Sequence, residues 1–255
     1  MLTETKKIIK YCEDYLDVDK FNDGCFNGLQ VEGAKKIDKI IVGVSWSEKL
    51  IKEAIKKKAR LIIVHHGIFK NDFGNKLQLK GFTKNRIKFL LENDINLAGF
   101  HLPLDAHRAI GNNISLIKLL KLKKTDVIDC PDYGEIGFIG EYKEAMKFED
   151  FYNLVCDELE TQPYVIPAGK KNVKRVGIIS GGASPNFKEA AELGADTYIC
   201  GDAREEVVRA VEETGINFIN AGHYNTEKIG IQNLGKLIAK KFKIKVEFVD
   251  VPCDV

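Results

Sequence analysis

The sequence predicts an α/β fold with two similar lobes, each built on a mostly parallel sheet flanked by helices. Short apolar runs alternate with amphipathic segments along most of the chain. Strands separated by helices of about ten residues or more pair in parallel, because the crossover returns the chain to the same end of the sheet. A length of 255 residues suits two such lobes.

The same order of elements appears in both halves of the chain. In the first half, strands are expected at 35–44, 60–64 and 95–100, and helices at 47–59, 84–94 and 112–124. In the second half, strands are expected at 134–142, 173–180, 195–200, 216–222 and 244–252, and helices at 147–160, 184–194, 204–215 and 226–242. The Ser-Gly-Gly-Ala-Ser-Pro segment at 180–185 is expected to be a tight turn, with Ser184 as helix N-cap and Pro185 in the first helical position.

Internal sequence similarity accompanies this repeated order. The triplet Lys-Glu-Ala at 52–54 recurs at 188–190, and Ile-Asn followed by a histidine and a carboxylate occurs at 95–105 and at 216–227. Two matches in the same order predict an internal duplication. We expect residues 1–125, completed by 220–255, to form the first lobe and residues 126–219 to form the second.

Composition and charge exclude several classes of protein. The 39 basic and 37 acidic residues give a net charge of +2, which argues against a dedicated nucleic-acid-binding protein. No apolar run approaches the ~18 residues of a membrane span, and the N-terminal segment lacks the apolar block of a signal peptide. The six cysteines include no Cys-x-x-Cys pair, so a thiolate zinc site is not expected. These features predict a cytoplasmic protein with reduced thiols.

Four of the five histidines lie at the ends of predicted strands. His65 and His66 follow one buried strand, whereas His101 and His223 each follow another and precede a carboxylate by four residues. Because open α/β sheets bind ligands at the carboxyl ends of their strands, these side chains are expected to converge. Pro103 disfavours a regular helix after His101, so a loop is expected there.

This number of imidazole and carboxylate ligands suits two metal ions better than one. A tetrahedral zinc ion takes four ligands, whereas two ions about 3.5–4 Å apart can share a carboxylate and a bridging water or hydroxide. The predicted ligands are His65, His66, His101, Asp105, His223 and Glu227. Zinc, iron, manganese and cobalt all accept such donors, so two divalent ions of undistinguished identity are expected. His107 is expected to be a non-ligand: a partner of a ligand, a proton shuttle or a solvated loop residue.

At these residues the chain resembles the Ngg-interacting-factor-like proteins, a family labelled GTP cyclohydrolase 1 type 2 homologues. The segments that carry the resemblance are FNDGCFNGLQVEG, AIKKKARLIIVHHGIFK, GFHLPLDAH, ADTYICGD and INAGHYNTEKIG. The resemblance assigns the same six residues to a metal pair, and it implies interlinked lobes and a ring-shaped homohexamer with its sites facing an internal cavity. The chain departs from many relatives at Ser45-Trp46-Ser47 and Cys25-Phe26, neither of which is expected to touch the ligands.

The expected function is that of a dinuclear-metal-dependent hydrolase acting on a purine nucleotide or a related phosphorylated compound. A metal-bridging hydroxide would be the nucleophile. In the cyclohydrolase reaction that the resemblance implies, it attacks the imidazole carbon of GTP and formate leaves. The alternative is a non-enzymatic, metal-stabilised ring-shaped oligomer that binds DNA or protein partners. Basic runs at 56–60 and 170–175 would serve DNA binding, although such runs are more often solvated faces.

Overall fold

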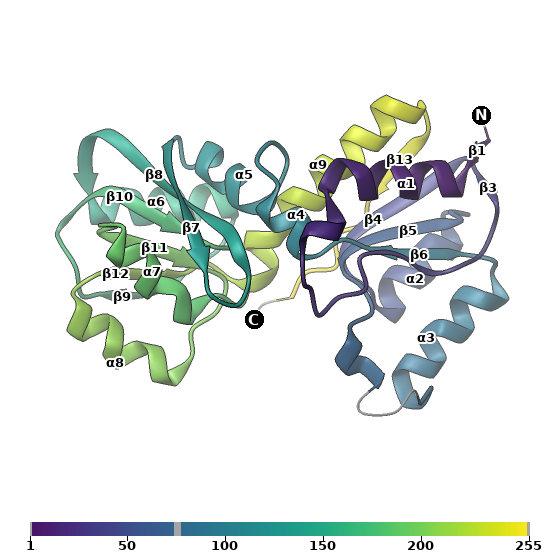
Figure 1. The fold of residues 1–255 in the computed structure, drawn as a ribbon, viewed down its shortest axis with the longest axis horizontal. Coiled ribbons are helices and arrows are strands. Elements are labelled where there is room, and N and C mark those ends of the chain that lie inside the picture. Colours follow the sequence, from purple (N-terminus) through teal and green to yellow (C-terminus); the bar gives the residue numbers. More distant parts are fainter. Residues whose placement is uncertain (1, 74–77, 254–255) are drawn as a thin grey trace. The chain divides into compact units, whose positions relative to one another are not determined.

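The computed structural model describes residues 2–73 and 78–253, which divide into two compact units (Figure 1). The first unit comprises Met1–Leu104 with Gly230–Val251, and the second comprises Asp105–Ile229 with Pro252–Val255. Each unit contains a mixed sheet with helices beside it, so the predicted α/β class is confirmed.

The sheet of the first unit runs in the order β13-β4-β5-β6-β2 within the described residues. Its strands are β2 (Gly28–Val31), β4 (Lys39–Ser45), β5 (Leu61–His66), β6 (Asn96–Gly99) and β13 (Lys245–Phe248). Strands β13, β4, β5 and β6 are parallel, and only β2 is antiparallel to its neighbour. Strands β4 and β5 are almost continuously apolar and buried, as parallel strands covered on both faces must be.

Helices and a short two-stranded pair complete the first unit. They are α1 (Thr5–Leu16), η1 (Val18–Lys20), α2 (Glu48–Lys56), η2 (Lys70–Phe73), α3 (Gly81–Glu92), the later turns of α9 (His223–Phe242), and the antiparallel strands β1 (Thr3–Glu4) and β3 (Lys36–Ile37). Helix α2 begins after Ser47, whose hydroxyl accepts a hydrogen bond from the N–H of Leu50. Its apolar face, with Ile51 and Ala54, packs into a core that also contains Trp46.

The sheet of the second unit is β7-β8-β10-β11-β12-β9 in the part of the chain that the structure describes. Its strands are β7 (Lys123–Cys130), β8 (Gly134–Lys147), β9 (Tyr164–Pro167), β10 (Asn172–Ile178), β11 (Thr197–Cys200) and β12 (Asn217–Asn220). Only the pairs β10–β11 and β11–β12 are parallel, so the predicted mostly parallel sheet is wrong for this unit. One reason is that β7 and β8 form a long antiparallel hairpin, which needs only a short turn and no crossover helix. The pairs β8–β10 and β9–β12 are antiparallel as well.

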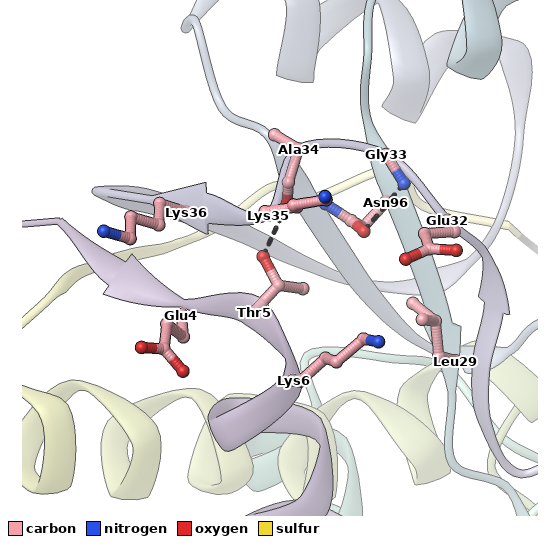
Figure 2. Close-up of a pocket in the computed structure, with 10 residues that line it drawn as sticks. All are labelled: Glu4, Thr5, Lys6, Leu29, Glu32, Gly33, Ala34, Lys35, Lys36 and Asn96. Carbon is pink, nitrogen blue, oxygen red and sulfur yellow. Dashed lines mark hydrogen bonds between the residues drawn. The ribbon is translucent and has the colours of Figure 1, made fainter.

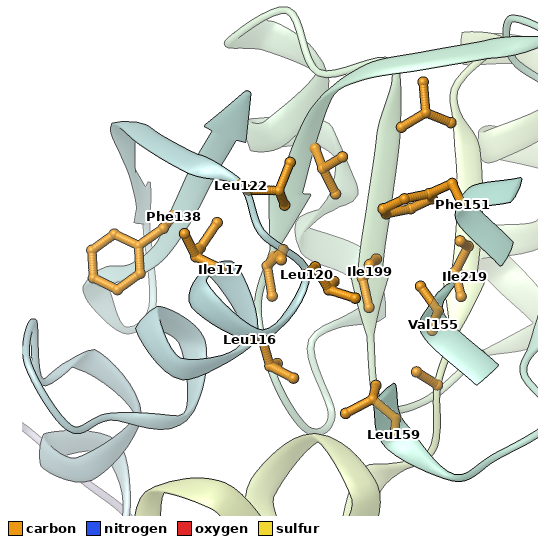
Figure 3. Packing of buried hydrophobic residues seen from close by; sticks show 14 of the residues in the cluster. Leu116, Ile117, Leu120, Leu122, Phe138, Phe151, Val155, Leu159, Ile199 and Ile219 are labelled. Atoms are coloured by element: carbon orange, nitrogen blue, oxygen red, sulfur yellow. The ribbon is translucent and has the colours of Figure 1, made fainter. Parts of the chain in front are cut away.

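The core of the second unit explains where the two units divide. The helices of this unit are α5 (Asn112–Leu119), α6 (Phe148–Leu159), η3 (Ser184–Asn186), α7 (Phe187–Glu192) and α8 (Glu205–Thr214), and the unit also includes the last two residues of α4 (Leu102–Ala106). In Figure 3, Leu116 of α5 and Phe151 of α6 belong to the same buried cluster as Ile199 and Ile219 of the sheet. Because α5 contributes to this core, the chain divides between Leu104 and Asp105 rather than at the expected residue 125.

Both units contain a βαβαβ core with the same order of elements. In the first it is β4-α2-β5-α3-β6 and in the second β10-α7-β11-α8-β12, with adjacent, parallel strands in each. His101 comes soon after the third strand of the first core, and His223 soon after the third strand of the second. Across the described residues, no helix has both the length and the apolar character needed to cross a membrane.

Candidate metal centre

Three predicted ligands lie together in the first unit. His65 and His66 are the last two residues of β5, and His101 lies two residues beyond the end of β6. The ring centroids of His65 and His66 are 4.6 Å apart, and the His101 ring lies 5.1 Å from the first and 5.6 Å from the second. One potential ligand atom from each ring lies within 4.8 Å of the other two. Adjacent side chains on a regular strand point to opposite faces, so the end of β5 is where such convergence can occur.

The hydrogen bond of His65 defines which of its ring nitrogens could bind a metal. The residue is completely buried, and its Nδ1 lies 3.0 Å from the carbonyl oxygen of Phe100. A carbonyl oxygen can only accept, so Nδ1 carries the proton and Nε2 carries the lone pair. Metal-binding histidines usually donate their other N–H to a carbonyl or carboxylate in this way.

Asp23, which is not among the residues predicted from the sequence, holds His101. Its Oδ1 accepts from Nδ1 of His101 and from the N–H of Cys25, each at 2.9 Å. Its Oδ2 accepts from Nδ2 of Asn27 and from the N–H of Leu102, also at 2.9 Å. Burial disfavours the ionised carboxylate, but the hydrogen bond from His101 and the other donors more than offset this and hold the pKa of Asp23 well below its usual range. The ionised carboxylate fixes the proton of His101 on Nδ1, so Nε2 is the nitrogen that would bind a metal.

A local signal for Asp23 exists in the sequence. The hydrogen bond to the N–H two residues later makes an Asx turn, which the Asp-Gly-Cys segment is suited to form. That signal predicts a turn and nothing more. The functional contact joins residues 78 positions apart, and local pattern carries no information about it.

His66 is held by the β4–α2 turn. Its Nδ1 lies 3.0 Å from Oγ of Ser45, and its carbonyl accepts from the N–H of Trp46 at 2.9 Å. The expectation that Ser45-Trp46-Ser47 touches no predicted ligand is therefore wrong. The reason is the parallel register, which places Ser45 directly opposite His66.

The second unit orients the other three predicted ligands. Oδ1 of Asp105 accepts from Nδ2 of Asn112 at 2.7 Å and from Oγ of Ser180 at 3.1 Å. The expected loop here is instead the short helix α4, because Pro103 occupies its first turn, where a missing N–H costs nothing. His223 begins α9 and Glu227 lies one turn later, which brings their Nε2 and Oε2 atoms to 3.1 Å.

The tight turn at 180–185 makes room for Glu227. Gly181 has a φ of +67°, and a Cβ at this position would collide with Oε1 of Glu227. The N–H of Gly181 donates to Oγ1 of Thr226 at 3.0 Å, which links the turn to the first turn of α9. The expected positions in this turn are wrong by one residue: Ala183 is the N-cap of η3, which begins at Ser184, so Pro185 is the second helical residue rather than the first.

His107 stabilises a turn. Its Nδ1 accepts from the N–H groups of Ala109 and Ile110 at 3.2 and 3.3 Å, just before α5. A nitrogen that accepts from main-chain donors carries no proton, so the neutral ring bears its proton on Nε2. The proton-shuttle role of His107 stays a prediction.

A cavity of about 310 Å³ also lies in the first unit, at the N-terminus of α1 (Figure 2). It is lined by Glu4, Thr5, Lys6, Leu29, Glu32, Gly33, Ala34, Lys35, Lys36 and Asn96. Two of its polar side chains already bind main-chain groups: Thr5 donates to the carbonyl of Ala34, and Asn96 accepts from the N–H of Gly33. None of the six predicted metal ligands lines it.

Comparisons with known proteins agree over nearly the whole chain. The profile of the family described as Duf34/NIF3 (NGG1p interacting factor 3) matches residues 3–254. Proteins named GTP cyclohydrolase 1 type 2 homolog are similar to it: one from Pseudomonas aeruginosa is 36% identical over 96% of each chain, and one from Haemophilus influenzae is 41% identical over 92% of this chain and 93% of the relative. The solved structure of protein ybgI, described as of unknown function, has a TM-score of 0.93 at 33% identity and covers 99% of this chain and 100% of that one.

Proposed function

Because the chain belongs to the Duf34/NIF3 (NGG1p interacting factor 3) family, we propose that it is a metal-dependent hydrolase acting on a purine nucleotide or a related phosphorylated compound. The observation that carries the proposal is the cluster of His65, His66 and His101, whose potential ligand atoms lie within 4.8 Å of one another. In two of these rings Nδ1 donates to a fixed acceptor. Preoriented Nε2 lone pairs are what a metal site requires.

We propose that two divalent ions are held, and that Asp105, His223 and Glu227 complete the ligand set. The chain order supports this, because α4 starts next to His101 and carries Asp105, and α9 starts at His223 and carries Glu227. The corresponding positions of His101 and His223 after the third strand of each core favour the predicted duplication. Zinc, iron, manganese and cobalt suit these donors. When bound, a pair of such ions lowers the pKa of a bridging water and supplies hydroxide near neutral pH.

Other residues of the protein hold the proposed ligand side chains in fixed orientations. Asp23 and the carbonyl of Phe100 hold two imidazoles, so little ligand freedom remains to be lost when an ion binds. Asn112 and Ser180 both donate to Oδ1 of Asp105, which fixes the plane of that carboxylate. Oriented ligands of this kind restrict where a substrate oxygen or carbon can approach the nucleophile.

The position of the Phe69 side chain favours a substrate that contains a planar base. Its ring lies 5.0 Å from that of His101 and 6.3 Å from that of His66, and it is half-buried. Stacking of a nucleobase on an aromatic side chain contributes about 1–3 kcal/mol. The name that the curated relatives carry makes GTP the first substrate to test.

Turnover by metal-loaded protein tests the proposal. GTP and a model phosphodiester are incubated with protein reconstituted separately with zinc, iron, manganese and cobalt, and formate and phosphate are measured. We expect turnover of at least one substrate, its loss in His101→Ala, and its retention in Asn96→Ala, because the Asn96 amide lies at the start of β6 and bonds to the main chain there, whereas His101 follows the end of that strand. No turnover with any of the four metals would contradict the hydrolase. The ring-shaped oligomer that binds DNA or protein stays a prediction, which salt-dependent DNA binding and the mass in solution would test.

A further inference from the structure

We propose that Gln30 is a positioning residue for the histidine cluster, a role that rests on the metal site proposed above. Its side-chain amide joins the main chain that follows His65 and His66 to the segment that contains Asp23, the partner of His101. The proposal concerns the geometry of the ligands, since the Gln30 amide bonds to main-chain groups of Phe26 and Ile68.

The hydrogen bonds of Gln30 are directed at two segments. Its Oε1 accepts from the N–H of Ile68 at 2.7 Å, and its Nε2 donates to the carbonyl of the same residue at 3.1 Å. Nε2 also donates to the carbonyl of Phe26 at 2.7 Å. Ile68 is two residues beyond His66, and Phe26 is three residues beyond Asp23. One amide therefore fixes both segments that define the positions of the imidazoles.

Two glycines provide the space that this side chain occupies. A Cβ at Gly67 would lie 2.6 Å from Nε2 of Gln30, and a Cβ at Gly99 would lie 2.7 Å from the same atom. Real Cβ atoms do not approach other atoms this closely, so Gln30 occupies a notch that a side chain at either position would fill. Gly67 follows His66 directly, and Gly99 is two residues before His101. The notch thus lies beside the strand ends that carry the ligands.

A β-bulge directs Gln30 into this notch. Strand β2 pairs with β6 through Gly28 opposite Gly99 and Leu29 opposite Ala98, and the register then shifts before Val31. Gln30 is the residue at the shift and has no partner across the ladder. Bulges of this kind commonly re-aim a side chain next to a functional site. The same two segments are also joined by a main-chain hydrogen bond, which the N–H of Phe26 donates to the carbonyl of Ile68 at 3.1 Å.

Asn96 provides a matched control within the same unit. Like Gln30, it accepts one main-chain hydrogen bond and donates two: its Oδ1 accepts from Gly33, and its Nδ2 donates to Ala34 and Arg60, at 2.8–2.9 Å. It lies at the start of β6, whereas Gln30 packs against Gly99 at the end of that strand. Removal of either amide costs comparable structural hydrogen bonds. Gln30 bonds to Ile68, just beyond the ligand-bearing end of β5, whereas Asn96 bonds to Arg60, just before the start of that strand.

The test measures the affinity of the apo protein for zinc and for cobalt by chelator competition. Gln30→Met, which keeps the volume and removes the hydrogen bonds, is expected to weaken binding by about 10-fold to 100-fold and to alter the visible absorption of the bound cobalt. Asn96→Ala is expected to lower thermal stability without either change. Equal metal affinities and cobalt spectra for the two variants would overturn the role of Gln30. A wild-type protein that binds neither metal would overturn the proposed metal site itself.

Gly67→Ala keeps the Gln30 side chain and gives a second test if Gln30→Met does not fold; a double-variant cycle extends it where Gln30→Ala folds. Gly67→Ala alone is expected to weaken metal binding, because its methyl group displaces the Gln30 amide. In the Gln30→Ala background the methyl group has room, so the same change is expected to have little further effect. Strictly additive effects on metal affinity would show that the two residues act independently and would overturn the proposal.

Discussion

Asparagine in place of Asp23 is expected to loosen His101 and to destabilise the apo protein, although the two side chains have nearly the same shape. Each carboxylate oxygen of Asp23 accepts two hydrogen bonds at 2.9 Å. An asparagine has one acceptor oxygen and one NH₂ group. In either orientation of the amide, its NH₂ group must face two donors.

The number of hydrogen bonds lost gives the expected size of the destabilisation. Two hydrogen bonds to a charged acceptor are lost, and such bonds contribute about 1.5–3 kcal/mol each, so the free energy of unfolding should fall by about 3–6 kcal/mol. The two remaining bonds weaken as well, because their acceptor is now neutral. His101 loses its carboxylate partner, which is expected to weaken metal binding by about 10-fold to 100-fold.

Chemical denaturation of the apo protein and chelator competition with zinc measure these two effects. Asp72→Asn is the control, because Asp72 is exposed and accepts a hydrogen bond from the N–H of Phe69, which an amide oxygen can also accept. That variant should unfold and bind zinc like the wild type. If Asp23→Asn also unfolded within about 1 kcal/mol of the wild type and bound zinc equally well, the assigned role of Asp23 would be refuted.

Three further perturbations probe other parts of the structure. Gly181→Ala should lower the melting temperature, because the φ of +67° strains an alanine and its Cβ collides with Glu227; a melting temperature equal to that of the wild type would contradict the described turn. Phe69→Ala should raise KM for GTP while leaving KM for a small phosphodiester unchanged, and Phe69→Leu should not restore GTP binding if stacking is the cause. The hydrogen bond from Lys57 lowers the pKa of Glu247, so its contribution to stability is present above about pH 4.3, its unfolded value, and disappears as the pH falls through the folded pKa. The melting-temperature difference between wild type and Glu247→Gln should therefore be largest near neutral pH and vanish in acid.

Local sequence patterns predicted the elements that carry the site. The apolar run that ends at His65 and His66 is a buried parallel strand, and the end of that strand is where both rings can turn toward His101. The same reasoning applies at His223, although the helix begins at this residue rather than three residues later. These features follow from periodicity over a few residues, which a single sequence displays.

The strand and the side chains that the sequence patterns did not identify are those that depend on long-range contacts. The helix predicted at 112–124 ends at Leu119, and its last two residues belong instead to β7, which pairs with β8 in a hairpin that buries Ile128 and Cys130. Asp23 and Gln30 lie in a polar segment that resembles an ordinary turn, and their importance comes from partners in distant strands. Side-chain contacts between segments so far apart leave no periodic trace in one sequence.

Elemental analysis of the purified, metal-reconstituted protein tests the central claim most directly. The proposed ligand set predicts about two divalent ions per chain, a lower content in His101→Ala and in His223→Ala, and no change in Asn96→Ala. A wild-type protein that retains no zinc, iron, manganese or cobalt after reconstitution and desalting would contradict the metal site and the hydrolase built on it.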